Sequence, residues 1–189
     1  MTMQELRAQC LGCTRCPLAA ERTNVVFGSG CESADIMFVG EGPGKNEDEQ
    51  GLPFVGRAGA LLDSYLAAVG LERENVYIAN IVKCRPPQNR DPQPEEQEAC
   101  IGWLREQFRI INPKLIVCLG RIAAKRMISD KILVTKEHGK IYRKGNVLMT
   151  ATFHPAALLR NPANKPDALD DFKKIARLAE CGFDLSALE

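Results

Sequence analysis

The sequence lacks a long apolar run, and it lacks an excess of charge of either sign. No stretch is long and apolar enough to cross a bilayer, so we expect no membrane partner. The first residues, MTMQELRAQC, show no apolar core of a secretory signal, which favours a cytoplasmic location. Lys and Arg number 25 against 24 Asp and Glu. This balance argues against a uniformly basic nucleic-acid binder, although it allows a local basic face.

The glycine-rich stretch at residues 39–63, VGEGPGKNEDEQGLPFVGRAGALLD, lacks both common phosphate-binding patterns. It contains neither G-x-G-x-x-G leading into a helix nor G-x-x-x-x-G-K-[ST], so a nucleotide phosphate loop is disfavoured. A different ligand must need this much backbone freedom beside a carboxylate and an aromatic side chain. The acidic residues Asp48 and Glu49 within it are expected to be solvated.

Histidine is scarce, with two residues, whereas cysteine is frequent, with eight. Disulfides are not expected, because the cytosol is reducing. Cys13 and Cys16 form a C-x-x-C pair, and Cys84 and Cys100 could complete four metal ligands, with Cys10 as a competitor. This spacing is not the doubled C-x-x-C of a zinc ribbon. It leaves zinc and an iron–sulfur cluster both open.

Apolar runs alternate with amphipathic segments along the whole chain. Strands are predicted at 35–40, 75–82, 114–120 and 146–153, and helices at 57–70, from Pro94 to Phe108, around Ile122 and Met127, and at 168–180. Such alternation predicts a parallel sheet covered by helices on both faces, in a single domain over residues 1–189.

Polar or glycine residues follow each predicted strand. They are Glu41, Asn80 near the end of the second strand, Gly120 and His154. Ligands of open α/β sheets bind outside the carboxyl ends of the strands, so Glu41, Asn80 and His154 are expected to converge on one crevice. The other histidine, His138, lies in a charged turn and has no such context. We expect it to be an ordinary surface or structural residue without a role in the chemistry.

A basic and apolar rim is expected around this crevice. Its members are Arg85, Arg90, Arg160, Lys165, Leu158 and Leu159. Cations that flank an apolar tip suit a surface that grips phosphates and inserts a wedge between stacked bases. An ordinary exposed loop would have the same composition.

Three motifs in this order resemble the family 4 uracil-DNA glycosylases, the iron–sulfur type. The motifs are GEGPGKNEDEQGLPFVGRAG, NIVKCRPPQNR and HPAALLRNP, which together with the cysteines span about residues 13–160. The resemblance implies a three-layer α/β/α fold with a central four-stranded parallel sheet. It also implies a [4Fe–4S] cluster held by Cys13, Cys16, Cys84 and Cys100, with Cys10 left out.

The resemblance assigns site roles residue by residue. Phe54 matches the residue that stacks on uracil, Asn80 the one whose amide pairs with the uracil edge, and Glu47 the side chain that excludes the 5-methyl group of thymine. His154 matches the histidine beside uracil O2, and Glu41 the carboxylate assigned to the attacking water. Gly42, in GEGPG, is expected to let backbone approach the flipped nucleotide.

The resulting hypothesis is a monofunctional enzyme that hydrolyses the N-glycosidic bond of uracil in single- or double-stranded DNA and acts as a monomer. None of the matched catalytic positions is a lysine, so no lyase step is expected. Two alternatives stay open. One is a cluster-containing nucleic-acid binding module without turnover, and the other is a redox protein that uses the cluster for electron transfer.

Overall fold

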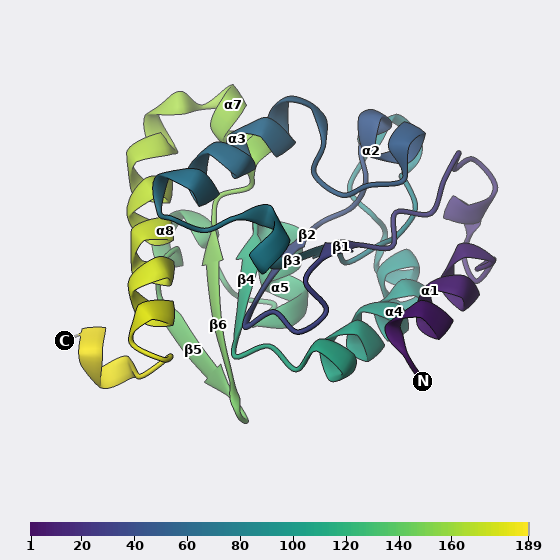
Figure 1. Cartoon of the computed structure of the whole chain (residues 1–189). Helices are drawn as coiled ribbons and strands as arrows, with labels where there is room; N and C mark the ends of the chain where they lie inside the picture. Colours follow the sequence, from purple (N-terminus) through teal and green to yellow (C-terminus); the bar gives the residue numbers. More distant parts are fainter. Residues whose placement is uncertain (189) are drawn as a thin grey trace.

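The computed structural model describes residues 1–188 and shows three layers, with helices on both faces of one sheet (Figure 1). Within these residues the sheet comprises β1 (Ser29–Gly30), β2 (Ile36–Gly40), β3 (Tyr77–Asn80), β4 (Leu115–Leu119), β5 (Ile141–Lys144) and β6 (Val147–Thr152). Their order across the sheet is β1-β3-β2-β4-β6-β5. The central β3, β2, β4 and β6 are parallel, which confirms the predicted parallel core.

Two edge strands extend the expected four-stranded parallel core to six strands. β1 pairs antiparallel with β3, and β5 pairs antiparallel with β6. With two residues, β1 is too short to show an alternating pattern. β5 and β6 form a hairpin around Gly145 and Asn146, in which Gly145 has a φ of 60°. A Gly-Asn pair between two β-forming runs is itself a hairpin signal in the sequence.

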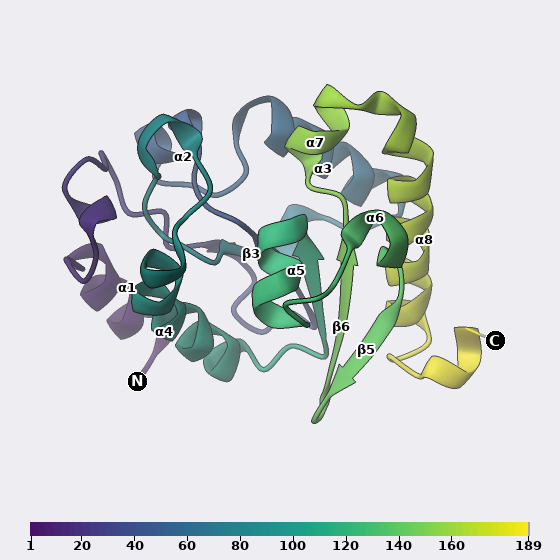
Figure 2. The same ribbon diagram turned by 180° about the vertical axis from the view of Figure 1, so that it is seen from behind.

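Two apolar clusters hold the helices against the sheet. On one face lie α1 (Met3–Leu11), α4 (Pro94–Ile111) and α5 (Arg121–Met127), as the view from behind shows (Figure 2). On the other face lie α3 (Gly56–Ala68), α7 (Pro155–Arg160) and α8 (Lys165–Glu180). The shorter helices are α2 (Lys45–Gln50), α6 (Val134–Glu137) and the 3-10 turns Pro17–Ala19, Arg73–Asn75, Pro87–Asn89, Pro162–Asn164 and Leu185–Leu188. Among all helices of residues 1–188, none has the length and apolar content that a membrane crossing needs.

The central strands are buried along their full length, as expected for parallel strands covered on both faces. Helix α4 shows how local sequence sets an element's start. Pro94 occupies its first turn, and Glu96 accepts a hydrogen bond from the Gln93 amide at 2.8 Å. The helix ends at Asn112, whose φ of 51° terminates the regular backbone.

Candidate active site

A cavity of about 500 Å³ opens at the carboxyl ends of the parallel strands. Glu41 follows β2, Asn80 ends β3, Gly120 follows β4 and His154 lies just beyond β6, and all four line the cavity. The predicted site residues Gly42, Glu47, Phe54, Arg90 and Arg160 also line it. The structure thus brings together the strand-end residues that the sequence predicts to converge. A larger groove, of about 700 Å³, lies between α4 and α5 and contains none of them.

Phe54 forms one wall of this cavity from the loop between α2 and α3. The end of β2 is shaped to receive it. A Cβ atom on Gly40 would lie 2.5 Å from both Phe54 Cζ and Asn80 Oδ1, so only glycine leaves room for the two side chains. The ring centroids of Phe54 and His154 lie 5.5 Å apart with a tilt of 34°. Phe54 and Asn80 therefore meet beside Gly40, and His154 packs against the Phe54 ring.

Asn80 carries a polar atom with no partner in the protein. Its side chain is 1% exposed, and among residues 1–188 its Oδ1 has no hydrogen-bond donor. Its backbone carbonyl, by contrast, accepts from Lys83 Nζ at 3.0 Å. An unpaired buried amide oxygen lowers stability by about 1–3 kcal/mol. A ligand N–H that reaches this oxygen would recover that energy.

His154 offers the cavity a neutral hydrogen-bond donor. Burial, and secondly the nearby Arg160, lower the pKa of His154 from 6.5 to about 4. The ring is therefore uncharged near pH 7. Its Nδ1 accepts from the Ala156 amide at 3.1 Å, at the start of α7, so the single ring proton lies on Nε2.

Glu41 is half-buried at the mouth of the cavity, and its proton affinity is unusual. Burial raises the pKa of Glu41 from 4.5 to about 7, and the neighbouring Asp91 raises it further. Arg121 and Arg160 act in the opposite direction. A carboxyl group with a pKa near 7 is suited to accept a proton at physiological pH.

The acidic run of α2 is structural rather than solvated at two of its positions. Both carboxylate oxygens of Glu47 are occupied, one by the Gly44 amide at 3.1 Å and the other by the Val55 amide at 2.9 Å. Asp48 corrects the expectation of a solvated residue. It is 3% exposed and accepts from the Thr23 amide at 2.9 Å, which secures the incoming N-terminal segment. Glu49 is exposed, as predicted.

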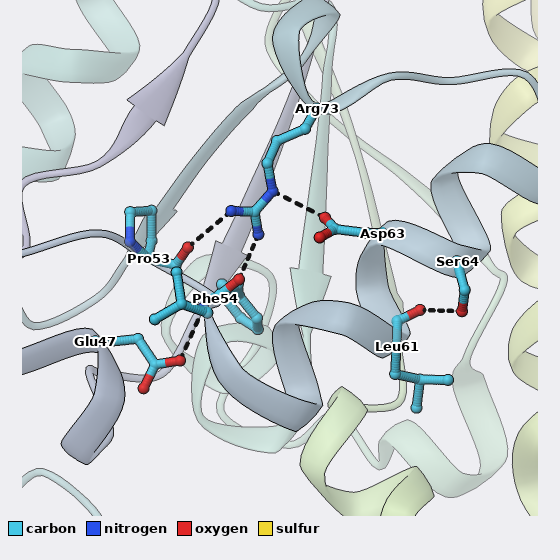
Figure 3. A network of polar contacts seen from close by, with 8 residues as sticks. Glu47, Pro53, Phe54, Leu61, Asp63, Ser64 and Arg73 are labelled. Atoms are coloured by element: carbon cyan, nitrogen blue, oxygen red, sulfur yellow. Dashed lines mark hydrogen bonds and ion pairs between the residues drawn. The ribbon is translucent and has the colours of Figure 1, made fainter. Parts of the chain in front are cut away.

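Arg73 is a residue of this region that no sequence motif indicates. It lies after α3, and its guanidinium points at the Phe54 loop from the side opposite Glu47 (Figure 3). It donates to the carbonyls of Pro53 and Phe54 at 3.2 Å and 2.5 Å, and to Asp63 at 2.8 Å.

The comparisons with known proteins agree with this geometry. Residues 27–177 match the uracil DNA glycosylase superfamily. The chain is 45% identical over 189 residues to the type-4 uracil-DNA glycosylase of Archaeoglobus fulgidus, which covers 96% of this chain and 94% of that protein. It is 51% identical over 166 residues to the type-4 enzyme of Thermotoga maritima, which covers 86% of each chain. The chain belongs to the type-4 uracil-DNA glycosylases.

A type-5 uracil-DNA glycosylase, from Pyrobaculum aerophilum, is a more distant relative. It is 38% identical over 91 residues, or 47% of this chain and 40% of that protein. This match covers less than half of each chain, whereas the two type-4 matches cover most of each chain. The family and the α/β fold are those that the motifs predict.

The apolar tip that a type-4 enzyme is expected to present to DNA is only partly at the surface. Leu158 is 1% exposed and belongs to the core cluster under α7, so its side chain does not reach DNA. Leu159 is half-buried and Arg160 is exposed. Of the two leucines, Leu159 alone is placed to contact a ligand outside the protein.

The two arginines of the loop before α4 differ in their partners. Arg90 forms a two-pronged ion pair with Glu96, at 2.7 Å and 2.9 Å, and the Glu96 side chain is 3% exposed. Arg85 donates only to the side chain of Asn89, at 2.7 Å. Arg90 therefore anchors the loop to α4, whereas the Arg85 charge has no carboxylate partner among residues 1–188.

Five cysteines line one small cavity between α1, the following segment and α4, together with Lys83 and Trp103. They are Cys10, Cys13, Cys16, Cys84 and Cys100. Three of the four predicted ligand sulfurs are acceptors of N–H groups. Trp103 Nε1 lies 3.4 Å from Cys13 Sγ, Arg22 lies 3.3 Å from Cys84 Sγ, and the Lys83 amide lies 3.2 Å from Cys100 Sγ.

These contacts are of the kind that surrounds the sulfur ligands of a metal centre. Among residues 1–188, no three His, Cys, Asp or Glu side chains are arranged to hold a single metal ion. A four-iron cluster separates its thiolates more widely than one tetrahedral ion does, and N–H donors to the sulfurs are typical of such clusters. The donor set is therefore compatible with [4Fe–4S], and of the five cysteines that line this cavity within the described residues, Cys10 and Cys16 receive none of these N–H contacts.

Lys83 connects this cavity with the active site. It is 1% exposed, and its Nζ donates to the carbonyl of Asn80 and, at 2.7 Å, to Gln107 Oε1. Its backbone amide contacts Cys100 Sγ. The amine is thus bound on the protein side of β3 and does not line the active-site cavity.

His138 is a second residue whose role the sequence does not reveal. Its Nδ1 lies 2.9 Å from Asp171 Oδ2, and its ring packs 4.8 Å from that of Phe153. Asp171, on α8, also accepts from Thr152 Oγ1 at 2.6 Å. His138 is therefore a structural residue, held by a partner 33 positions away in the chain, next to the strand end that carries His154.

Proposed function

We propose that this chain excises uracil from DNA by hydrolysing the N-glycosidic bond, which leaves an abasic site for base excision repair. One observation carries the proposal. The buried, unpaired Oδ1 of Asn80 lies beside the Phe54 ring and the neutral His154, at the strand ends where ligands of this fold class bind.

Uracil recognition follows from hydrogen-bond complementarity at Asn80. The amide oxygen accepts from uracil N3–H, and the amide NH₂ donates to O4. Cytosine presents an acceptor and a donor at the same two positions, so both contacts fail. Glu47 is held rigidly by two backbone amides, so it cannot move aside for the 5-methyl group of thymine.

Access to the base requires the nucleotide to leave the stack. Unpairing and unstacking cost a few kcal/mol, and this cost is lower for a base that is already single-stranded. Arg160 lines the cavity, and Leu159 and Arg85 are sequence neighbours of the lining residues Arg160 and Pro86. All three are proposed to hold the opened strand, with Gly42 giving the backbone close access. Single- and double-stranded DNA are both proposed substrates, and one chain supplies the whole site as a monomer and as one domain.

Bond cleavage separates charge, and the site is arranged for both signs. As the C1′–N1 bond breaks, its electron pair stays on uracil, and the His154 Nε2–H donates to O2 where negative charge develops. One such donor is typically worth about 2.7–4 kcal/mol. The water oxygen bonds to C1′, and Glu41 as the carboxylate orients this water and takes its proton.

The reaction is proposed to be monofunctional. The buried Lys83 amine is bound to Asn80 O and Gln107, so it is not positioned to attack the sugar. Among residues 1–188 no lysine lines the cavity, which leaves hydrolysis by water as the proposed reaction.

A [4Fe–4S] cluster is proposed to be held by Cys13, Cys16, Cys84 and Cys100. When bound, it supplies a covalent tie between the N-terminal segment, the loop after β3 and helix α4. The chain's own part is to direct Trp103, Arg22 and the Lys83 amide at the sulfurs, which stabilises the thiolate form of the ligands.

Excision from an oligonucleotide with one uracil, followed by alkaline cleavage, tests the proposal. Strand scission at uracil that requires alkali is expected, with none at cytosine or thymine. Asn80→Ala is expected to abolish excision while affinity for abasic-site DNA stays within threefold. A wild-type protein that binds DNA with its cluster intact but cuts nothing would establish the binding module instead.

A further inference from the structure

The loop that carries Phe54 has an uncommon backbone conformation. Phe54 has a φ of 51°, in the left-handed region that bulky residues rarely adopt. The loop is also packed against the start of α3, because a Cβ atom on Gly59 would lie 1.9 Å from the Phe54 carbonyl oxygen. Such a conformation persists only when its surroundings hold it.

Arg73 and Glu47 hold the two peptide planes that flank the Phe54 Cα atom. The Pro53 carbonyl belongs to the plane before Phe54, and it accepts from Arg73 at 3.2 Å. The plane after Phe54 is bound at both ends, its carbonyl by Arg73 at 2.5 Å and its Val55 amide by Glu47 at 2.9 Å. These contacts, drawn in Figure 3, fix φ and ψ of Phe54 together.

Arginine is the side chain suited to this task. Its planar fork can donate to two carbonyls at once and keeps its charge at every working pH. The third contact, to Asp63 on α3, engages Nε and leaves both terminal nitrogens to the carbonyls. The Arg73 side chain is 24% exposed and that of Asp63 is 51% exposed, so the clamp lies at the surface behind the cavity wall.

We propose that Arg73 is a positioning residue for excision: by binding the carbonyls of Pro53 and Phe54 it keeps the Phe54 ring flat against the flipped base. This inference rests on the proposed function, in which Phe54 stacks on uracil. Arg73 itself touches neither the base nor the sugar. It therefore acts through Phe54 alone, and its removal should have no further effect once Phe54 is replaced.

A double-mutant cycle tests this coupling. Single-turnover excision is measured with saturating enzyme for Arg73→Ala, Phe54→Leu and the double variant. Arg73→Ala should slow excision about tenfold, as expected for a misplaced stacking partner, and affinity for abasic-site DNA should stay within threefold. The double variant should be no more than twofold slower than Phe54→Leu. Additive losses would overturn the proposal.

Two further variants separate the clamp from general stability. Arg73→Lys keeps the charge but lacks the fork, so its rate should fall between those of wild type and Arg73→Ala. Asp63→Asn removes the ion pair and leaves both carbonyl contacts, so its rate should stay within threefold of wild type. All rates are taken well below each variant's unfolding temperature. An Asp63→Asn variant as slow as Arg73→Ala would overturn the clamp.

A spectroscopic measurement keeps the inference testable whether or not the protein excises uracil. 4-Fluorophenylalanine is incorporated at the seven phenylalanines, and the Phe54 ¹⁹F resonance is identified by its loss in Phe54→Leu. Arg73→Ala should shift and broaden this resonance, whereas Asp63→Asn should leave it in place. An unchanged resonance in Arg73→Ala would overturn the clamp, while an inactive wild type with the expected shift would refute only the proposed function.

Discussion

The active-site cavity and the cysteine cavity treat their polar atoms in opposite ways. In the first, Asn80 Oδ1 is buried with no partner among residues 1–188. In the second, N–H groups of Trp103, Arg22 and Lys83 are already directed at sulfur atoms. An unpaired group is suited to a ligand that enters and leaves, and sulfur atoms that already accept N–H groups are suited to an occupant that stays. Substitutions in the first should therefore change rate, and those in the second should change stability.

The largest effect on rate is expected at His154. His154→Asn retains a side-chain acceptor for the Ala156 amide at the start of α7 but withdraws the Nε2–H from the cavity. Loss of one donor to the developing charge should slow single-turnover excision by about 10²–10³-fold. Unfolding temperature, followed by circular dichroism, should change by less than about 3 °C. Excision within tenfold of wild type would remove His154 from the proposed mechanism.

The opposite pattern is expected at Cys84. Cys84→Ser should lose most bound iron and lower the unfolding temperature by roughly 10 °C, because a structural metal centre contributes directly to folding. The matched control is Cys10→Ala, which changes a buried cysteine of the same cavity that is not a proposed ligand. Iron content and the visible absorbance spectrum measure the difference. Equal iron loss in both variants would place Cys10 in the ligand set.

The two regions are nevertheless joined by Lys83, which contacts Cys100 through its amide and Asn80 through its Nζ. Loss of the cluster should therefore reach the active site through this residue. In Cys84→Ser we expect residual excision, measured well below the unfolding temperature, to fall together with uracil affinity. Substitutions in the cysteine cavity should then mainly lower stability, and they should also lower the excision rate to a smaller extent.

Glu41 should make excision in the active-site cavity depend on pH. Because its pKa is raised to about 7, mainly by burial, it takes up a proton below this pH and loses the ability to accept one from water. The value of kcat/KM for the wild type should rise to a plateau above pH 7 and lie roughly tenfold lower at pH 6. His154, with a pKa of about 4, does not titrate in this range.

Glu41→Gln tests whether Glu41 causes the fall of kcat/KM below pH 7, the acidic limb of the profile. The variant should be slower at every pH, and its profile should be flat between pH 6 and 8. Asp91, which faces Glu41 and pairs with Arg121, provides the control, because Asp91→Asn should shift the limb to lower pH without abolishing it. An acidic limb that persists unchanged in Glu41→Gln would assign the proton to another group.

The sequence predicted the parts of this molecule that follow from chain topology. The carboxyl ends of parallel strands must meet at one edge, so the convergence of Glu41, Asn80 and His154 could be inferred from the positions of three strands. The motifs supplied the family. Neither the strand positions nor the motifs show which side chain or backbone group a given charged residue binds in the folded protein.

The errors have this common origin. Leu158 and Leu159 are identical, adjacent residues. Only the way the short helix α7 is rotated against the core decides which of them is buried. Asp48 reads as one charge of an acidic run until the Thr23 amide is found beside it. Arg73 belongs to no motif, and the carbonyls it binds lie about twenty residues away in the chain. Such contacts are set by packing, which residue patterns do not encode locally.

The smallest predicted effect concerns the strand that leads to His154. Thr152 donates to Asp171, which His138 also contacts, so this buried contact fixes the end of β6 two residues before the proposed catalytic ring. Thr152→Val removes the hydroxyl without changing the side chain's shape. Thr150→Val is the matched control, because Thr150 lies two residues earlier on β6, and its buried Oγ1 has no partner among residues 1–188.

Thr152→Val is expected to slow single-turnover excision about threefold, the result of a lost hydrogen bond of roughly 0.5–1.5 kcal/mol that is only partly transmitted to His154. Thr150→Val should retain the wild-type rate and gain slightly in stability, because an unpaired buried hydroxyl is removed. The rates, taken at a temperature where both variants are folded, compare two identical substitutions on one strand. A Thr152→Val rate equal to that of Thr150→Val would show that α8 supports the fold but not the position of His154, and would confine the control of rate to the Phe54 side of the cavity.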